Sequence, residues 1–271
     1  MIIASNVGSI SLRNNLYNTT NKLKESSRKL STGKQISKAT DNPSGLAIAQ
    51  KMKSQNSGLE QAKRNTQDAV SLLQVAEGGL KGVHKALRRM RDLAVQASNG
   101  TLQSEERQAL DKEVQDLLNE IDNIAQETEF NGKKLLNGNY DTNGLSFQIG
   151  ANTNQKVEIK ISDMSASNLG LSIGVDTKSN SEAAIQKIDQ AINKVSSERT
   201  KLGSFQTSLS HKLDSLSTTN TNLSASEGRI ADTDMAAEKS KYTKNKILLK
   251  FNSAMTSQID KKAADVLSLL E

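Results

Sequence analysis

Residues 59–97, LEQAKRNTQDAVSLLQVAEGGLKGVHKALRRMRDLAVQA, decide the fold class of this chain. Apolar and small side chains recur there at steps of three and four residues, which is the spacing of one helix face. The pattern runs through the whole stretch, as in the a and d positions of a coiled coil. The positions are Leu59, Ala62, Thr66, Ala69, Leu73, Ala76, Leu80, Val83, Leu87, Met90, Ala94 and Ala97. We therefore expect one long helix that packs along a narrow seam.

Two further stretches keep the same step. After a break at residues 98–100, the second comprises Leu110, Val114, Leu117, Ile121, Ile124 and Thr128, so the first two helices should form a hairpin. The third comprises Ile185, Ile188, Ile192, Val195, Arg199, Leu202, Gln206, Leu209, Leu213, Leu216, Asn220, Leu223, Glu227 and Ile230. A single helix over residues 181–227 would be about 70 Å long. The sequence thus predicts a mainly α fold, an elongated coiled-coil helical rod.

Strand-like sequence is confined to the segment between the second and third helices, at about 140–175. LSFQIG (145–150) and KVEIKI (156–161) alternate apolar with polar side chains and are separated by the turn-rich ANTNQ, which predicts a small β-hairpin. LGLSIGV (169–175) is a candidate third strand.

The two ends of the chain have apolar residues at helical spacing among many Ser, Thr and Asn. Such weak helices need a partner, so we expect the terminal segments, 1–33 and 235–271, to form a coiled coil on assembly. The expected self-assembly residues are Ile3, Val7, Ile10, Leu16, Leu23, Leu30, Ile247, Phe251, Met255, Ile259, Val266 and Leu269. Residues 34–45 form a connector to the rod, 46–234, with Asn42 as the N-cap and Pro43 as the first helical residue.

Composition argues against catalysis. Only 3% of the 271 residues are aromatic, and without cysteine there is no disulfide, zinc-thiolate site or thiol nucleophile. His84 and His211 lie off the seams and are expected to be exposed, and no metal or cofactor motif is found. The net charge of +6 is dispersed, and no apolar run reaches 18 residues, so neither nucleic acid nor membrane is an expected partner. The first residues also lack the pattern of a signal peptide.

Several longer strings identify a resemblance. They include KLSTGKQISKATDNPSGLAIAQKM (29–52), MRDLAVQASNGT (90–101), NEIDNIAQETEFNGKKLLNG (119–138), IDQAINKVSSERTKLGSFQTSL (188–209) and NLSASEGRIADTDMAAE (222–238). With these, the chain resembles a bacterial flagellin of short form, the conserved core without a large variable outer domain. The resemblance implies a structural subunit that polymerises into the flagellar filament for swimming motility. Its terminal helices would pair in an inner tube, and its rod would form the outer tube.

The resemblance also implies partners and a location. The subunit would assemble with copies of itself and meet the flagellar export apparatus, an export chaperone, the filament cap and the hook-junction proteins. It would be secreted, extracellular, and exported without a cleavable signal peptide. Flagellins are recognised by a Toll-like receptor of animal hosts through exposed residues of the rod, and the matching positions here are Arg89, Leu93 and Glu113.

The main alternative is a hook-filament junction protein of the same superfamily. Such a protein would share the terminal helices but should match poorly across MRDLAVQ, EFNGKKLLNG and SSERTKLG, which this chain has. A basic coiled-coil nucleic-acid binder would need clustered charge, and a flagellin-borne protease would need a metal motif. The chain has neither feature.

Overall fold

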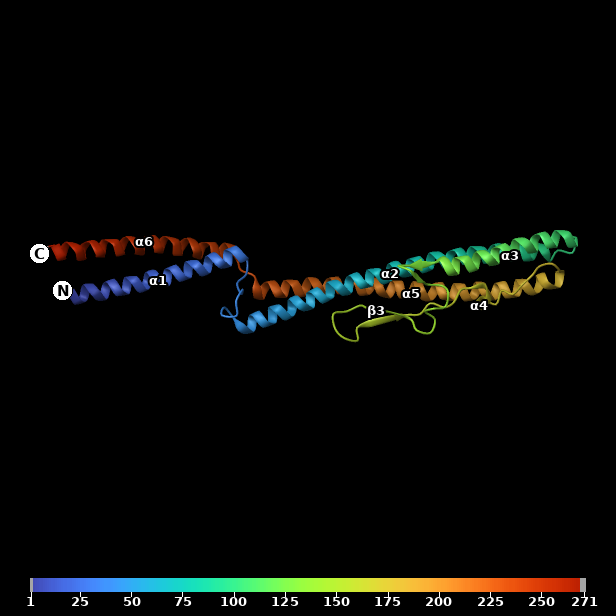
Figure 1. The fold of residues 1–271 in the computed structure, drawn as a ribbon, viewed down its shortest axis with the longest axis horizontal. Helices are drawn as coiled ribbons and strands as arrows, with labels where there is room; N and C mark the ends of the chain where they lie inside the picture. Colours follow the sequence, from blue (N-terminus) through green and yellow to red (C-terminus); the bar gives the residue numbers. More distant parts are fainter. Residues whose placement is uncertain (1, 269–271) are drawn as a thin grey trace. The chain divides into compact units, whose positions relative to one another are not determined.

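The computed structural model describes the backbone of residues 2–268 and the side chains of residues 8–261. Over that range the chain is mainly helical, as predicted, with two small antiparallel strand pairs (Figure 1). The helices are α1 (Ile2–Thr32), α2 (Pro43–Ala97), α3 (Ser104–Glu127), α4 (Ala166–Leu169), α5 (Lys178–Ala231) and α6 (Met235–Ser268). The strands are β1 (Glu129–Phe130), β2 (Lys133–Lys134), β3 (Leu145–Gln148) and β4 (Lys156–Ile159).

The chain divides into two compact units. Residues 1–55 and 221–271 form the terminal unit, and residues 56–220 form the central unit. Helices α2 and α5, of 55 and 54 residues, contribute to both. The units are described separately below.

The seam predicted from residues 59–97 is the core of the central unit. All twelve of its positions are buried, including the large side chains Leu73, Leu80, Leu87 and Met90. Helix α5 contributes a large buried side chain in each of five successive heptads, at Ile188, Val195, Leu202, Leu209 and Leu216. Helix α3 adds Val114 and Ile121 to the same cluster. Heptad spacing therefore buries a continuous core with few aromatic side chains.

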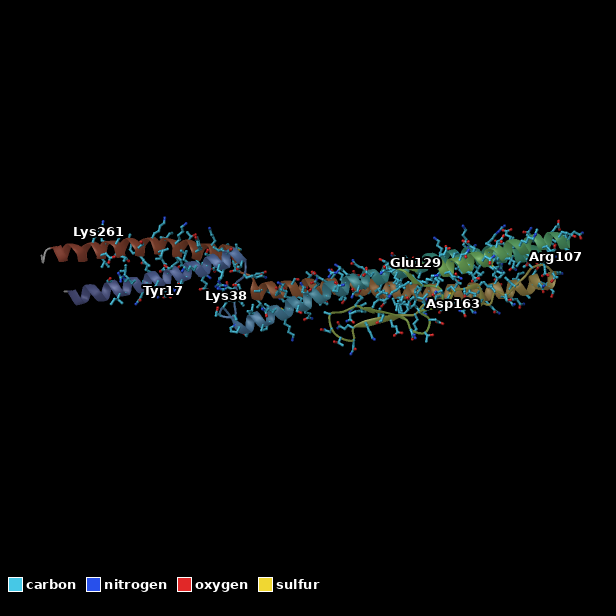
Figure 2. The ribbon with its side chains drawn as sticks, in the orientation of Figure 1. Tyr17, Lys38, Arg107, Glu129, Asp163 and Lys261 are labelled. Atoms are coloured by element: carbon cyan, nitrogen blue, oxygen red, sulfur yellow. The ribbon has the colours of Figure 1, made fainter. Side chains whose placement is uncertain are left out.

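The turn after α2 produces the predicted helical hairpin. Arg107 of α3 donates hydrogen bonds to the Ala97 and Asn99 carbonyl oxygens, both at 2.9 Å, and so caps the end of α2. A cation at a helix C-terminus also interacts favourably with the helix dipole. At the start of α3, Gln103 and Glu106 form a capping box. Figure 2 shows Arg107 at this end of the hairpin.

The strand region confirms one prediction and overturns another. Strands β3 and β4 pair antiparallel, with Leu145 opposite Ile159, as the predicted hairpin requires. The prediction of a third strand at 169–175 was wrong. Its first residue ends the helical turn α4, and Gly170 then takes the left-handed conformation at φ 81°. The backbone that follows forms hydrogen bonds with side chains of α3 and does not pair with another strand. Gln115 donates to the Ile173 carbonyl, and Asp111 accepts from the Val175 N–H.

In the terminal unit, α1 and α6 lie side by side (Figure 1). Helix α2 begins at Pro43, and the Asn42 side chain accepts a hydrogen bond from the Gly45 N–H at 2.9 Å. The predicted cap is therefore confirmed. None of the described helices combines the length and the apolar composition needed to cross a bilayer.

Candidate assembly surfaces

Helix α1 presents a mixed seam to α6. Leu16, Leu23 and Leu30 are half-buried, whereas Thr19 and Ser26, which lie between them at the steps of three and four, are buried. The predicted leucines therefore do line one helix face. The polar positions that alternate with them are the more deeply buried ones.

The facing side of α6 follows the same spacing. Its half-buried positions are Tyr242, Asn245, Leu249, Asn252, Thr256 and Ile259. Asn252 donates to the Thr19 hydroxyl at 3.4 Å. Polar residues at seam positions weaken apolar packing but specify register. The seam thus fixes how α1 and α6 align while contributing modest stability.

A buried carboxylate lies at the start of α6. Glu238 is 4% exposed and accepts a hydrogen bond from Ser26 of α1 and another from Lys241 at 3.3 Å. The Ser26 hydrogen bond, with Lys241 and the nearby charge of Lys29, lowers the pKa of Glu238 despite its burial. The ionised form is therefore the one that joins the two helices.

The opposite face of α6 is apolar and exposed. Ile247 is 62% exposed and Phe251 61%, with Leu248 and Met255 beside them. Of the predicted α6 stripe, only Ile259 turns toward α1, and the other described members face solvent. On α1, Ile10 and Tyr17 are also exposed, and Tyr17 is labelled in Figure 2.

Some predicted assembly residues fall outside this description. The side chains of Ile3, Val7 and Val266 are not among the described ones, and Leu269 lies beyond the described residues altogether.

Ion pairs hold the connector in place within the terminal unit. Arg28 of α1 donates two hydrogen bonds to the Asp41 carboxylate, at 2.9 and 2.7 Å, and also contacts the Ser37 hydroxyl. The Arg28 guanidinium, together with the Ser37 and Lys38 N–H groups, holds the pKa of Asp41 well below its usual range. Lys34 pairs with Asp232 at 2.7 Å, and the Gln35 N–H donates to the Ala231 carbonyl at 2.7 Å.

Arg89 and Glu113, two of the positions matched to a receptor contact, are brought together. The Arg89 Nε and Nη2 lie 2.8 and 2.5 Å from Glu113 Oε1, and both side chains are accessible. Leu93, expected among the exposed residues, is 1% exposed and packs in the core of the central unit. It lies on the seam side of α2, between Met90 and Ala94, and this explains its burial.

Sequence reasoning missed the polar half of the terminal seam and the Glu238 anchor. A signal was present, since Thr19 and Ser26 continue the three-and-four step of Leu16, Leu23 and Leu30. Hydrophobic spacing does not detect these positions because their side chains are polar. His84 also differs from expectation: it is half-buried, while His211 is exposed as predicted.

The comparisons with known proteins agree with this geometry. Residues 3–141 match the bacterial flagellin N-terminal helical region, and residues 185–270 match the bacterial flagellin C-terminal helical region. The chain belongs to the bacterial flagellin family. It is 40% identical to a flagellin of Halalkalibacterium halodurans over 273 residues and 39% identical to that of Bacillus subtilis over 303 residues, with both chains covered completely in each case. A crystal structure of Bacillus cereus flagellin superposes with a TM-score of 0.52 at 35% identity, covering 60% of this chain and 94% of that one.

Family membership assigns the general role. This flagellin is a structural subunit of the flagellar filament, a self-assembling polymer. The similar proteins carry the name flagellin, so the hook-filament junction protein is not the favoured alternative. The length of the chain fits a short flagellin without a large variable domain.

Proposed function

We propose that this flagellin polymerises through its terminal helices, which form the inner coiled coil of the filament, while the rest of the chain forms the outer layer. In this proposal residues 1–33 and 235–271 are the inner-tube helices, 34–45 the connector, and 46–234 the rod with its β-hairpin at about 140–175. The filament serves swimming motility, and the chain performs no catalysis.

The exposed apolar face of α6 carries this proposal. Ile247, Leu248, Phe251 and Met255 lie on the side of the helix turned away from α1, where the single chain leaves them in water. Contiguous exposed apolar side chains mark interaction surfaces. Copies of the same helix pair provide a matching surface, since α1 also exposes Ile10 and Tyr17.

Family membership supports the remaining partners. We propose that the chain leaves the cell through the flagellar export apparatus, without a cleavable signal peptide, after escort by an export chaperone. It then becomes extracellular in the filament and meets the cap and the hook-junction proteins.

A host Toll-like receptor is a further proposed partner. Arg89 and Glu113 offer it a preformed ion pair on the accessible face of α2 and α3. Leu93 would contribute by supporting that face from within, since it is buried. Arg89→Ala should lower receptor activation in a reporter assay, with Arg64→Ala as a control on an exposed part of α2.

Electron microscopy of the full-length purified chain tests the main proposal. After nucleation by a mild precipitant, the protein should form long filaments, and sheared fragments of them should seed further growth. Aggregates without helical order, or a chain that stays monomeric under all such conditions, would refute it.

A further inference from the structure

Helix α2 carries a row of cations in the central unit. Lys81, Lys85 and Arg88 are exposed and lie at positions i, i+4 and i+7, which places them on one helix face within about 10 Å. In the part of the chain that the structure describes, none of the three forms an ion pair. Like charges at this spacing repel one another, so an anionic partner would be favourable.

The row borders a groove of about 800 Å³. Gly78 lines this groove and has open space beside it, since a Cβ atom there would meet nothing within 4 Å. Arg199 of α5 and His84 line its wall, and the Arg199 Nε and His84 Nδ1 atoms are buried without a hydrogen-bond partner. Burial, with the charges of Arg199 and Arg88, lowers the pKa of His84. The groove therefore combines positive charge with unmet hydrogen-bonding groups.

The complementary charges lie on α3. Asp116, Glu120 and Glu127 are exposed on one face of that helix and, among the described residues, form no ion pair. Lys112 lies one turn before Asp116 on the same face, just as Asp92 follows Arg88 by one turn on α2. The single opposite charge thus follows the basic run on α2 and precedes the acidic run on α3, so the two patterns match when the helices run antiparallel.

The direction of the helices favours pairing between copies. The short turn at 98–103 makes α2 and α3 antiparallel within one chain. In a polymer whose subunits all point the same way, α3 of one copy also runs antiparallel to α2 of its neighbour. An antiparallel register places Arg88 opposite Asp116, Lys85 near Glu120 and Asp92 opposite Lys112.

We infer that the basic groove of α2 receives the acidic face of α3 from a second copy of this chain. The inference rests on the proposed polymerisation and adds an electrostatic contact between central units. Because the two surfaces differ, the contact is heterologous, and heterologous contacts that do not close give open filaments. The Arg88–Asp116 and Lys85–Glu120 pairs set the register.

Charge exchange tests this contact. Polymerisation of Lys85→Glu and Glu120→Lys variants is nucleated at low ionic strength with a neutral polymer and followed by light scattering and electron microscopy. Each single variant should grow on the order of tenfold more slowly, because like charges then face each other. The double variant, and a one-to-one mixture of the two single variants, should recover most of the wild-type rate. In both cases every groove again meets an opposite charge.

The controls separate assembly from folding. Lys178→Glu, an exposed charge reversal at the start of α5, should polymerise normally, and all variants should keep the wild-type circular dichroism. Single variants that grow at the wild-type rate would overturn the inference. So would a Lys85→Glu defect that neither the double variant nor the mixture rescues, since another anion would then occupy the groove. Failure of the wild-type chain itself to polymerise would instead refute the proposed function.

Discussion

The Ser26 hydroxyl of α1 donates a hydrogen bond to the carboxylate of Glu238 at the first turn of α6. The two residues are 212 positions apart in the sequence, and both are buried. Asp234 caps the same turn by accepting from the N–H groups of Ala236 and Ala237. The start of α6 is therefore fixed against α1 by polar groups, whereas the outer face of α6 remains free for other contacts.

Glu238 should make the pairing of α1 and α6 sensitive to acid. Its pKa in the folded chain is lowered below the ordinary value of 4.5, mainly by the Ser26 hydrogen bond. A lowered pKa contributes stability that is present above 4.5 and is lost as the pH falls through the folded-state value. Proteolysis of the terminal helices in the monomer should therefore accelerate on acidification below that range.

The Glu238→Gln variant tests this assignment. It keeps the shape but removes the charge, and should destabilise the helix pair at neutral pH by about 1–3 kcal/mol. Its proteolysis should show a smaller pH dependence than that of the wild type. An equal acid response in both chains, measured with an acid-tolerant protease, would assign the effect to another group.

The α1 leucines should matter for assembly more than for the central unit. Replacing Leu16, Leu23 and Leu30 together by Ala should cost about 1–2 kcal/mol per residue, since each is half-buried. Filament yield should fall strongly, whereas the melting of the central unit should be unchanged because its core lies in residues 56–220. Lys24→Ala, on the exposed side of α1, is the matched control. Normal filament yield from the triple variant would show that this seam is dispensable.

The two faces of α6 should have separable roles. Phe251→Ser removes an exposed side chain, so the monomer should fold as before but elongate seeds poorly. Leu249→Ser alters the half-buried face toward α1 and should weaken the helix pair itself, which protease sensitivity of the monomer would reveal. If Phe251→Ser filaments grew normally, the exposed apolar face would not be an assembly surface.

Periodicity predicted the core of this protein because most of its seam positions are apolar. Every position from Leu59 to Ala97 in the predicted seam is buried. The small hairpin of β1 and β2 was not predicted, although Asn131 and Gly132 turn it with positive φ values of 51° and 72°. An Asn-Gly pair favours such turns, but two-residue strands are too short for an alternating pattern.

The assembly surfaces were harder to predict for a different reason. Sequence spacing placed Leu16 and Ile259 on helix faces, but it could not tell which face of α6 meets α1 and which remains open. That choice depends on the long-range Ser26–Glu238 contact and on polar seam residues such as Asn252, which hydrophobic spacing does not detect. The Arg28–Asp41 clamp likewise depends on the path of the connector, which no periodic pattern encodes.

Deleting residues 239–271 should separate folding from assembly. The core of the central unit draws on α2, α3 and α5 and uses no residue from the deleted segment. The truncated chain should therefore remain strongly helical by circular dichroism and melt cooperatively. Helix α1 would lose the partner that covers Leu16 and Leu23, so it should become more sensitive to protease.

The same truncated chain should fail to elongate filament seeds. It lacks both the α6 seam that aligns α1 and the exposed apolar face that includes Phe251 and Met255. Seeds of the full-length protein, incubated with truncated or full-length monomer and measured by electron microscopy, provide the comparison. The full-length chain should lengthen them, and the truncated one should not. If the truncated chain elongated seeds at the full-length rate, α6 would not be an assembly element, and the rod contacts of the central unit would have to hold the filament together alone.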